Sequence, residues 1–198
     1  MVKQMDLRVQ KSKRLIKDTF LNLMEKKGYK NITITDIAAE AQINRKTFYF
    51  HYESIDKLYN DISDECLSLI DFSTLLSTLQ IDLEHSNFLS MAVSTLEQIK
   101  LQKETFRILM NDTTNNCFNE RLKFFLSETL NNTTRLSDYA SRKNIPFPLI
   151  QNIYSSLYFE IVRWWVNQED ILSKEAIDLM MSLFSDSMLD AMGIQFIS

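Results

Sequence analysis

Glycine and proline are scarce in this chain of 198 residues, which has two of each. A β-sheet protein needs turn residues roughly every 8–12 positions, and Gly28, Gly193, Pro146 and Pro148 are too few to supply them. The same scarcity leaves long stretches uninterrupted by the two residues that most disfavour helices. Because 45% of the residues are hydrophobic, the chain can also build a core. The sequence therefore predicts an all-α protein.

Cysteine is equally scarce, with Cys66 and Cys117 alone. Two thiols are no disulfide framework for a chain of this size, so we expect both to be free and mostly buried in a reducing compartment. The N-terminal residues lack the apolar segment of a secretory signal. No run of about 18 apolar residues is present to span a membrane. We therefore expect a cytoplasmic protein with no membrane partner.

Excess positive charge is confined to the start of the chain. The net charge is −4, yet residues 1–60 carry 12 Lys and Arg against 7 Asp and Glu. Residues 61–198 carry 10 basic residues against 19 acidic ones. A basic module on an acidic remainder is typical of proteins that bind a polyanion such as nucleic acid. The alternative is that the imbalance reflects only solvated helix faces.

Apolar periodicity and capping residues define the expected helices. Thr33 with Asp36 has the pattern of a capping box, Asn44 is a second N-cap, and Gly28 stands where a left-handed cap would end the first helix. We expect about nine helices: over about 7–27, 34–41, 45–51, 86–101, 103–111, 116–141, 147–167 and 173–192, with one more after Ser54. Residues 131–134 are a candidate break inside the helix over 116–141.

Residues 33–52 have the organisation of a helix-turn-helix, whose second helix enters the DNA major groove. Ala38 and Ala41 are small where the two helices must cross closely, and Phe48 is the expected inward anchor. Base contacts give specificity, whereas phosphate contacts give affinity. We assign base readout to Arg45, Lys46, Thr47 and Phe50, and backbone contacts to Thr35, Tyr49, His51 and Lys57.

Over roughly residues 8–62, the sequence resembles the TetR family of bacterial regulators. The matching segment is ITITDIAAEAQINRKTFYFHYESIDKLYNDI, with its T-x-x-D-I-A start, the T-F-Y core, and the residues Tyr52 and Leu58. The resemblance implies a DNA-binding domain over 1–62 and a helical effector-binding and dimerisation domain over 63–198. It also implies an Ω-shaped homodimer that inserts its recognition helices into successive major grooves of a near-palindromic operator of double-stranded DNA.

Two positions depart from the family pattern. Gln42 occupies the turn position usually held by glycine, which costs about 1 kcal/mol if its φ is positive. Ile55 stands where the family often has a phosphate-binding lysine, and Lys57 lies nearby on a different face. Both departures bear on how strongly the motif binds DNA.

The C-terminal part offers candidates for an effector pocket and for a dimer interface. Aromatic and methionine residues at helical spacing are usually core, and some of them are candidates to line a pocket for a small molecule, which we favour over a protein effector. The pocket candidates are Met91, Phe106, Met110, Phe118, Phe125, Tyr154 and Tyr158.

The helix over 147–167 is apolar on more than one face and so needs two neighbours. It is either a central core helix or one that, with the last helix, also faces a partner subunit. The interface candidates are Ile161, Trp165, Met180, Leu183 and Phe184.

Catalytic motifs are missing from the sequence. It has no glycine-rich phosphate loop, nucleophile elbow or HExxH site, so we expect no catalytic residue, metal ligand or cofactor. The prediction is a sequence-specific transcriptional regulator, a repressor released by its ligand. Two alternatives stay open: a protein-interaction module with a degenerate helix-turn-helix, and a helical enzyme.

Overall fold

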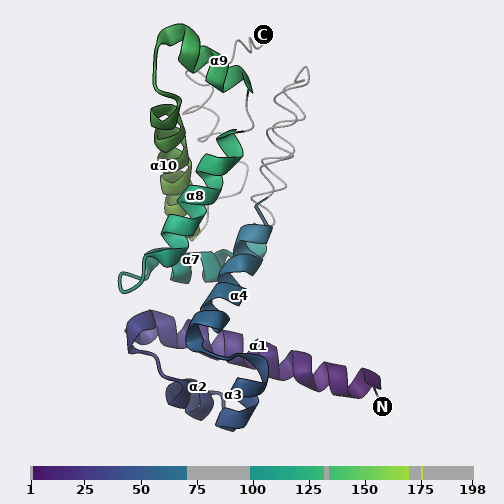
Figure 1. Ribbon diagram of the computed structural model, residues 1–198. Coiled ribbons are helices and arrows are strands. Elements are labelled where there is room, and N and C mark those ends of the chain that lie inside the picture. The colour runs from purple at the N-terminus through teal and green to yellow at the C-terminus, as the bar shows by residue number, and fades with distance from the viewer. Residues whose placement is uncertain (1, 71–98, 132–133, 170–174, 176–198) are drawn as a thin grey trace. The chain divides into compact units, whose positions relative to one another are not determined.

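The computed structural model describes residues 2–70, 99–131, 134–169 and 175, and these form helices and connecting turns with no strand among them (Figure 1). The all-α prediction is confirmed. The chain forms two compact units: Met1–Leu67 with Ile108–Phe118, and Ser68–Arg107 with Asn119–Ser198. The first unit thus continues beyond residue 62 and takes in a short later segment. No described helix has the length and apolar character needed to cross a bilayer.

The first unit holds α1 (Val2–Lys27), the 3-10 helix η1 (Tyr29–Asn31), α2 (Ile34–Glu40), α3 (Arg45–His51) and α4 (Ile55–Ser68). Apolar residues at helical spacing on these elements form one core. Its members include Ile16, Phe20, Leu23, Met24, Ile37, Phe48, Leu58, Tyr59 and Ile62. Helix α3 has the predicted bounds, whereas α1 begins five residues earlier than predicted.

The predicted caps of the first unit are confirmed for α2 and α3. Thr33 Oγ1 accepts from the Asp36 N–H at 3.2 Å, and the Asp36 carboxylate accepts from the Thr33 N–H at 2.7 Å. Asn44 Oδ1 accepts from the Lys46 N–H at 2.9 Å. The prediction for Gly28 is wrong in detail, since φ is +74° and ψ is 154°. This positive-φ backbone is extended, a region that only glycine occupies readily.

The second unit holds parts of α7 (Lys103–Asn111) and α8 (Cys117–Asn131), together with α9 (Thr134–Lys143) and α10 (Phe147–Val166). The helix predicted over 116–141 is two helices, divided at the candidate break. Most of the helix predicted over 86–101 lies outside the described residues. So does the one over 173–192, apart from Glu175.

The two cysteines differ in environment, so the expectation that both are buried is wrong for one of them. Cys66 is fully buried, and burial raises the pKa of its thiol to about 12. Cys117 is exposed at the first residue of α8.

Candidate nucleic-acid interface

The turn between α2 and α3 fixes the recognition helix. The Ile43 N–H donates to the Ala38 carbonyl at 3.0 Å, and the Gln42 N–H donates to the Ala39 carbonyl at 3.2 Å. Gln42 has a φ of +53°, so it occupies the left-handed conformation that glycine adopts without strain. Ala38 and Ala41 are buried, as expected for a close crossing of two helices.

Helix α3 has one buried side chain and a polar outer face. Phe48 is fully buried and anchors the helix, as predicted. Arg45 and Lys46 are exposed at its N-terminal end, while Tyr49 and Phe50 are 49% and 68% exposed. The Tyr49 ring packs edge-on against the ring of the buried Phe48, with 5.8 Å between the ring centroids. The Phe50 ring meets the His51 ring edge-on at 5.1 Å, and most of it stays in contact with solvent.

The remaining DNA-contact candidates differ in how exposed their side chains are and in whether another residue engages them. Thr35 is exposed in the first turn of α2, Lys57 is exposed in the first turn of α4, and Thr47 is half-buried. His51 Nε2 lies 2.7 Å from Ser12 Oγ of α1. Burial lowers the pKa of His51, and the charge of Lys13 lowers it further. A lowered pKa favours the neutral form of the His51 imidazole, which can still take part in a hydrogen bond.

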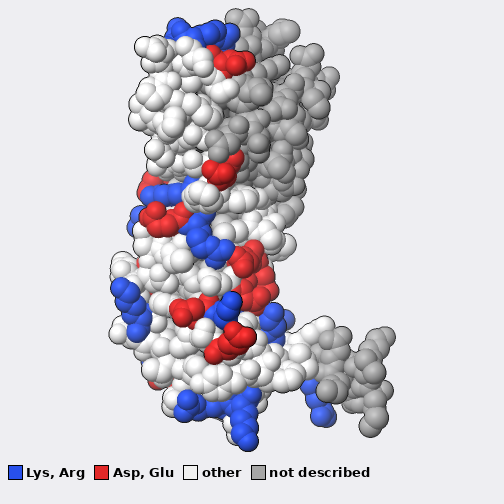
Figure 2. Space-filling model, viewed as in Figure 1, with Lys and Arg blue, Asp and Glu red and all other residues white. Residues whose placement is uncertain are grey.

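The cations of the first unit form two groups. Ion pairs hold Arg14 (with Asp18), Lys13 and Lys17 (with Asp61), Lys26 (with Glu40) and Lys27 (with Asp36). Within the described residues, no ion pair engages the exposed side chains of Arg8, Lys11, Lys30, Arg45, Lys46 and Lys57. Figure 2 shows blue side chains along the lower edge of the view, in the region of α3, and another on the N-terminal half of α1.

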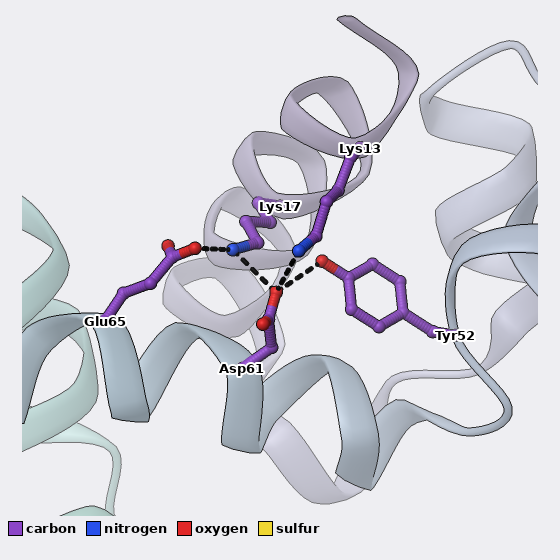
Figure 3. A network of polar contacts seen from close by, with 5 residues as sticks. All are labelled: Lys13, Lys17, Tyr52, Asp61 and Glu65. Atoms are coloured by element: carbon purple, nitrogen blue, oxygen red, sulfur yellow. Dashed lines mark hydrogen bonds and ion pairs between the residues drawn. The ribbon is translucent and has the colours of Figure 1, made fainter. Parts of the chain in front are cut away.

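Figure 3 shows the polar network that holds the lysines of α1 against α4. Asp61 Oδ2 lies 3.0 Å from Lys13 Nζ and 2.7 Å from Lys17 Nζ, and it accepts a 2.8 Å hydrogen bond from Tyr52 Oη. Lys17 also pairs with Glu65. Partial burial acts to raise the pKa of Asp61, but hydrogen bonds from Lys17, Lys13 and Tyr52 outweigh it and hold the pKa at about 2. These two lysines are neutralised within the protein, which their sequence positions alone did not indicate.

A segment far along the chain closes the other end of the first unit. The Asp112 carboxylate accepts from the Tyr29 N–H at 3.2 Å, and Thr114 Oγ1 accepts from the Lys30 N–H at 3.3 Å. The Phe118 N–H donates to Tyr59 Oη of α4 at 3.0 Å. Residues 108–118 thereby join the helix-turn-helix unit, a contact that no local pattern predicts.

The effector-pocket candidates are divided between the two units. Met110 and Phe118 are buried in the first unit, whereas Phe106 is buried and Phe125 half-buried in the second. Met91 and the side chains of Tyr154 and Tyr158 lie outside what the structure describes. A packing role is thus favoured for Met110 and Phe118.

Among the dimer-interface candidates, the side chain of Trp165 is described, and it is 1% exposed within a single chain. The side chain of Ile161 and all of Met180, Leu183 and Phe184 lie outside the described residues. Among the side chains of α10 that the structure describes, the large apolar ones that are exposed are Leu149, Ile153 and Trp164, at 50%, 55% and 41%. Their spacing places them within about 60° of one another around the helix axis.

Comparison with known proteins agrees with this arrangement. Residues 16–62 match the model of bacterial regulatory proteins of the tetR family, and residues 86–187, half of the chain, match that of a transcriptional regulator C-terminal region. Over 78 residues the chain is 37% identical to the uncharacterized HTH-type transcriptional regulator YxbF of Bacillus subtilis (strain 168). That match spans 38% of this chain and a fifth (20%) of the length of YxbF.

Two solved structures share the fold. A TetR transcriptional regulator from Streptococcus agalactiae 2603V has a TM-score of 0.54 and 21% identity, covering 92% of this chain and 98% of that one. AibR, in complex with isovaleryl coenzyme A and operator DNA, has a TM-score of 0.50 and 18% identity, covering 87% and 97%. The two family models and the fold lead to one conclusion: the chain belongs to the tetR family of bacterial regulatory proteins.

Proposed function

We infer that this protein is a ligand-responsive repressor that binds a palindromic operator as a homodimer. The observation that carries the inference is the outer face of α3, where Arg45 and Lys46 are exposed and Phe48 anchors the helix from behind. Arginine and lysine donate well to guanine O6 and N7 in the major groove. Because these two cations are not engaged in ion pairs within the described residues, no internal carboxylate competes with DNA for them.

Phosphate contacts would come from residues around α3. Thr35, Tyr49 and Lys57 are exposed, and we assign them to the DNA backbone, with His51 as a neutral hydrogen-bonding group. Phe50 fits contact with a thymine methyl group, since apolar side chains read that group. Thr47 completes the set for base readout.

Selection from a randomised duplex pool tests this function. The bound fragments should share a near-palindrome with at least one G at a fixed position of each half-site. Titrations with the selected duplex and with a scrambled duplex of equal length then measure specificity. Recovery of no common sequence, with equal affinity for both duplexes, would favour a protein-interaction module.

Dimerisation would use α10 together with the last helix. The exposed apolar face of Leu149, Ile153 and Trp164 suits a second copy of the chain, because a dimeric regulator needs a self-complementary surface. Trp165 is already buried within its own chain. It would therefore pack beneath this surface and would not contact the partner subunit directly.

The effector is proposed to be a small molecule bound in the second unit, near Phe106 and Phe125. AibR, which shares the fold, was solved with isovaleryl coenzyme A and operator DNA together. Here α7 crosses from one unit into the other after Arg107, and α8 crosses after Phe118. A ligand that shifts either helix would therefore displace Asp112 and Thr114, which accept hydrogen bonds from Tyr29 and Lys30 of η1.

A test of the effector is reciprocal coupling. A ligand that releases the operator should weaken operator binding by ~1–3 kcal/mol, and the operator should weaken ligand binding by the same factor. Equal ligand affinity with and without the operator would exclude that ligand as an effector.

A further inference from the structure

The N-terminal half of α1 extends beyond the part of the chain that the family model matches. The model begins at residue 16, whereas α1 begins at Val2. Residues 2–15, about four turns of this helix, thus lie outside the matched segment. Their position relative to α3 is fixed by contacts within the first unit.

One hydrogen bond locates this stretch beside the recognition helix. Ser12 Oγ lies 2.7 Å from the Nε2 atom of His51, the last residue of α3. Arg8 is one helical turn before Ser12 on the same face of α1, about 6 Å further along the axis. Lys11 immediately precedes Ser12. Figure 1 shows the N-terminal part of α1 running out past α3.

The charges of this stretch are available for a partner. Arg8 and Lys11 are exposed, and neither belongs to an ion pair in the part of the chain that the structure describes. By contrast, Lys13 and Lys17 are held by Asp61, and Arg14 lies 3.7 Å from Asp18. The division is positional: Lys13 and Lys17, which face α4, are neutralised, whereas Arg8 and Lys11, which precede Ser12, are not paired within the described residues.

We propose that Arg8 and Lys11 form a second DNA contact, binding the phosphates of the strand that passes the C-terminal end of α3. The occupant is the backbone of the same duplex that α3 reads, so this inference rests on the proposed function. Charge complementarity and the Ser12–His51 contact carry it, since a helix seated in the major groove brings its C-terminal end close to a phosphate strand. Such contacts add affinity without adding base preference.

The test compares Arg8→Gln/Lys11→Gln with Lys30→Gln and with wild type, each as the full chain. Lys30 is the matched control because it is an exposed cation without an ion pair among the described residues, in η1, which follows the opposite end of α1. Binding to the duplex selected from the randomised pool is titrated at several salt concentrations. Each phosphate contact contributes about 0.9 to the slope of log K against log salt, so four lost in a dimer should lower the slope by about 3.6.

The double variant should also lose about tenfold or more in affinity at 0.15 M salt, for selected and scrambled duplexes alike. Lys30→Gln should match wild type in slope and affinity. A double variant that also matches wild type would overturn the inference while leaving the proposed function intact. If wild type selects no sequence at all, the proposed function itself fails.

Neutral methylphosphonates at single positions of one half-site then identify the phosphates. Wild type should lose affinity at one or two positions where the double variant loses nothing further. Equal losses for both proteins at every position would show that Arg8 and Lys11 act only through their long-range field, and would overturn a direct contact. Equal melting temperatures of the variants and wild type exclude a folding defect.

Discussion

Tyr52 Oη lies 2.8 Å from Asp61 Oδ2, and the same oxygen receives Lys13 and Lys17 of α1. One carboxylate thereby connects α1 and α4 to Tyr52, the residue that follows α3. We expect Asp61→Asn to lower the free energy of unfolding by about 1–2 kcal/mol, because two lysines lose their counter-charge. Urea denaturation measures the loss. Glu53→Gln, which removes an exposed carboxylate from the neighbouring loop, should stay within about 0.5 kcal/mol of wild type.

The same pair of proteins gives a pH dependence. The pKa of Asp61 is about 2 in the folded chain, below its ordinary value of 3.8. The contribution of Asp61 to the free energy of unfolding is therefore complete above the ordinary pKa. It is lost as the pH falls through the pKa that Asp61 has in the folded chain. The stability difference between wild type and Asp61→Asn should be constant above about pH 5 and shrink between about pH 4 and pH 2. A difference that is unchanged at pH 3 would contradict the assignment.

Gln42 has a φ of +53° in the turn between α2 and α3. Gln42→Gly should raise the free energy of unfolding by about 0.5–1 kcal/mol, since relief of the left-handed strain exceeds the added freedom of the unfolded chain. Gln42→Ala keeps the strain and should give no gain. The urea unfolding midpoints of wild type and the two variants measure this difference. Equal gains in stability for both variants would show that loss of the Gln42 side chain, and not relief of backbone strain, stabilises the protein.

Gly28 lies against the segment that closes the first unit. A Cβ built on it would stand 2.6 Å from Thr114 Cγ2, at a φ of +74°. Gly28→Ala should therefore cost about 1–3 kcal/mol of unfolding free energy. Adding Thr114→Ser removes the clashing methyl group and keeps the hydroxyl that accepts from Lys30, so it should restore part of the loss. If the double variant recovers no stability, the whole loss in Gly28→Ala comes from the positive φ at residue 28 and not from the clash with Thr114.

Arg45 begins the recognition helix, where side chains meet base edges. Arg45→Ala should weaken binding to the selected duplex by ~1–3 kcal/mol and relax the preference at one position of each half-site. Tyr49→Phe removes a hydroxyl assigned to phosphate and should weaken selected and scrambled duplexes alike. If Arg45→Ala lost equally on both duplexes, Arg45 would be a phosphate contact and base readout would fall to Lys46 or Thr47.

Ile153 lies on the exposed apolar face of α10. Wild type should sediment as a dimer at micromolar concentration, with an interface of ~2,000 Å² or more. Ile153→Lys should shift it to monomer, because an unpaired lysine ammonium is costly to bury in an apolar interface. Leu101→Lys, at a leucine that is 87% exposed outside α10, is the control and should remain dimeric. A monomeric wild type would contradict the proposed assembly.

Local chemistry explains which elements could be predicted from the sequence. Helix α3 has the predicted bounds because Asn44 caps its start and a short apolar pattern fixes its inner face. The capping box at Thr33 is equally local. Such signals lie within a few residues of the structure they specify, so one sequence suffices to read them.

Long-range pairing explains what could not be predicted. Ser12 and His51 are 39 positions apart, and Tyr29 and Asp112 are 83 apart. No periodicity links such residues, so the sequence indicated neither the contact of α1 with α3 nor the docking of residues 108–118. Nor did the sequence indicate that Lys13 and Lys17 pair with Asp61, which lies more than 40 positions further along the chain.

The contrast between the two cysteines makes the chain selective toward thiol reagents. Cys66 is buried with a pKa of about 12, so almost none of it is thiolate at pH 7, and reagents do not reach it. Cys117 is exposed and directly precedes Phe118, whose N–H donates to Tyr59. A maleimide dye would therefore label the native sequence at one place per chain, without engineered cysteines. Its emission would follow the junction between α4 and α8 while operator and ligand are titrated.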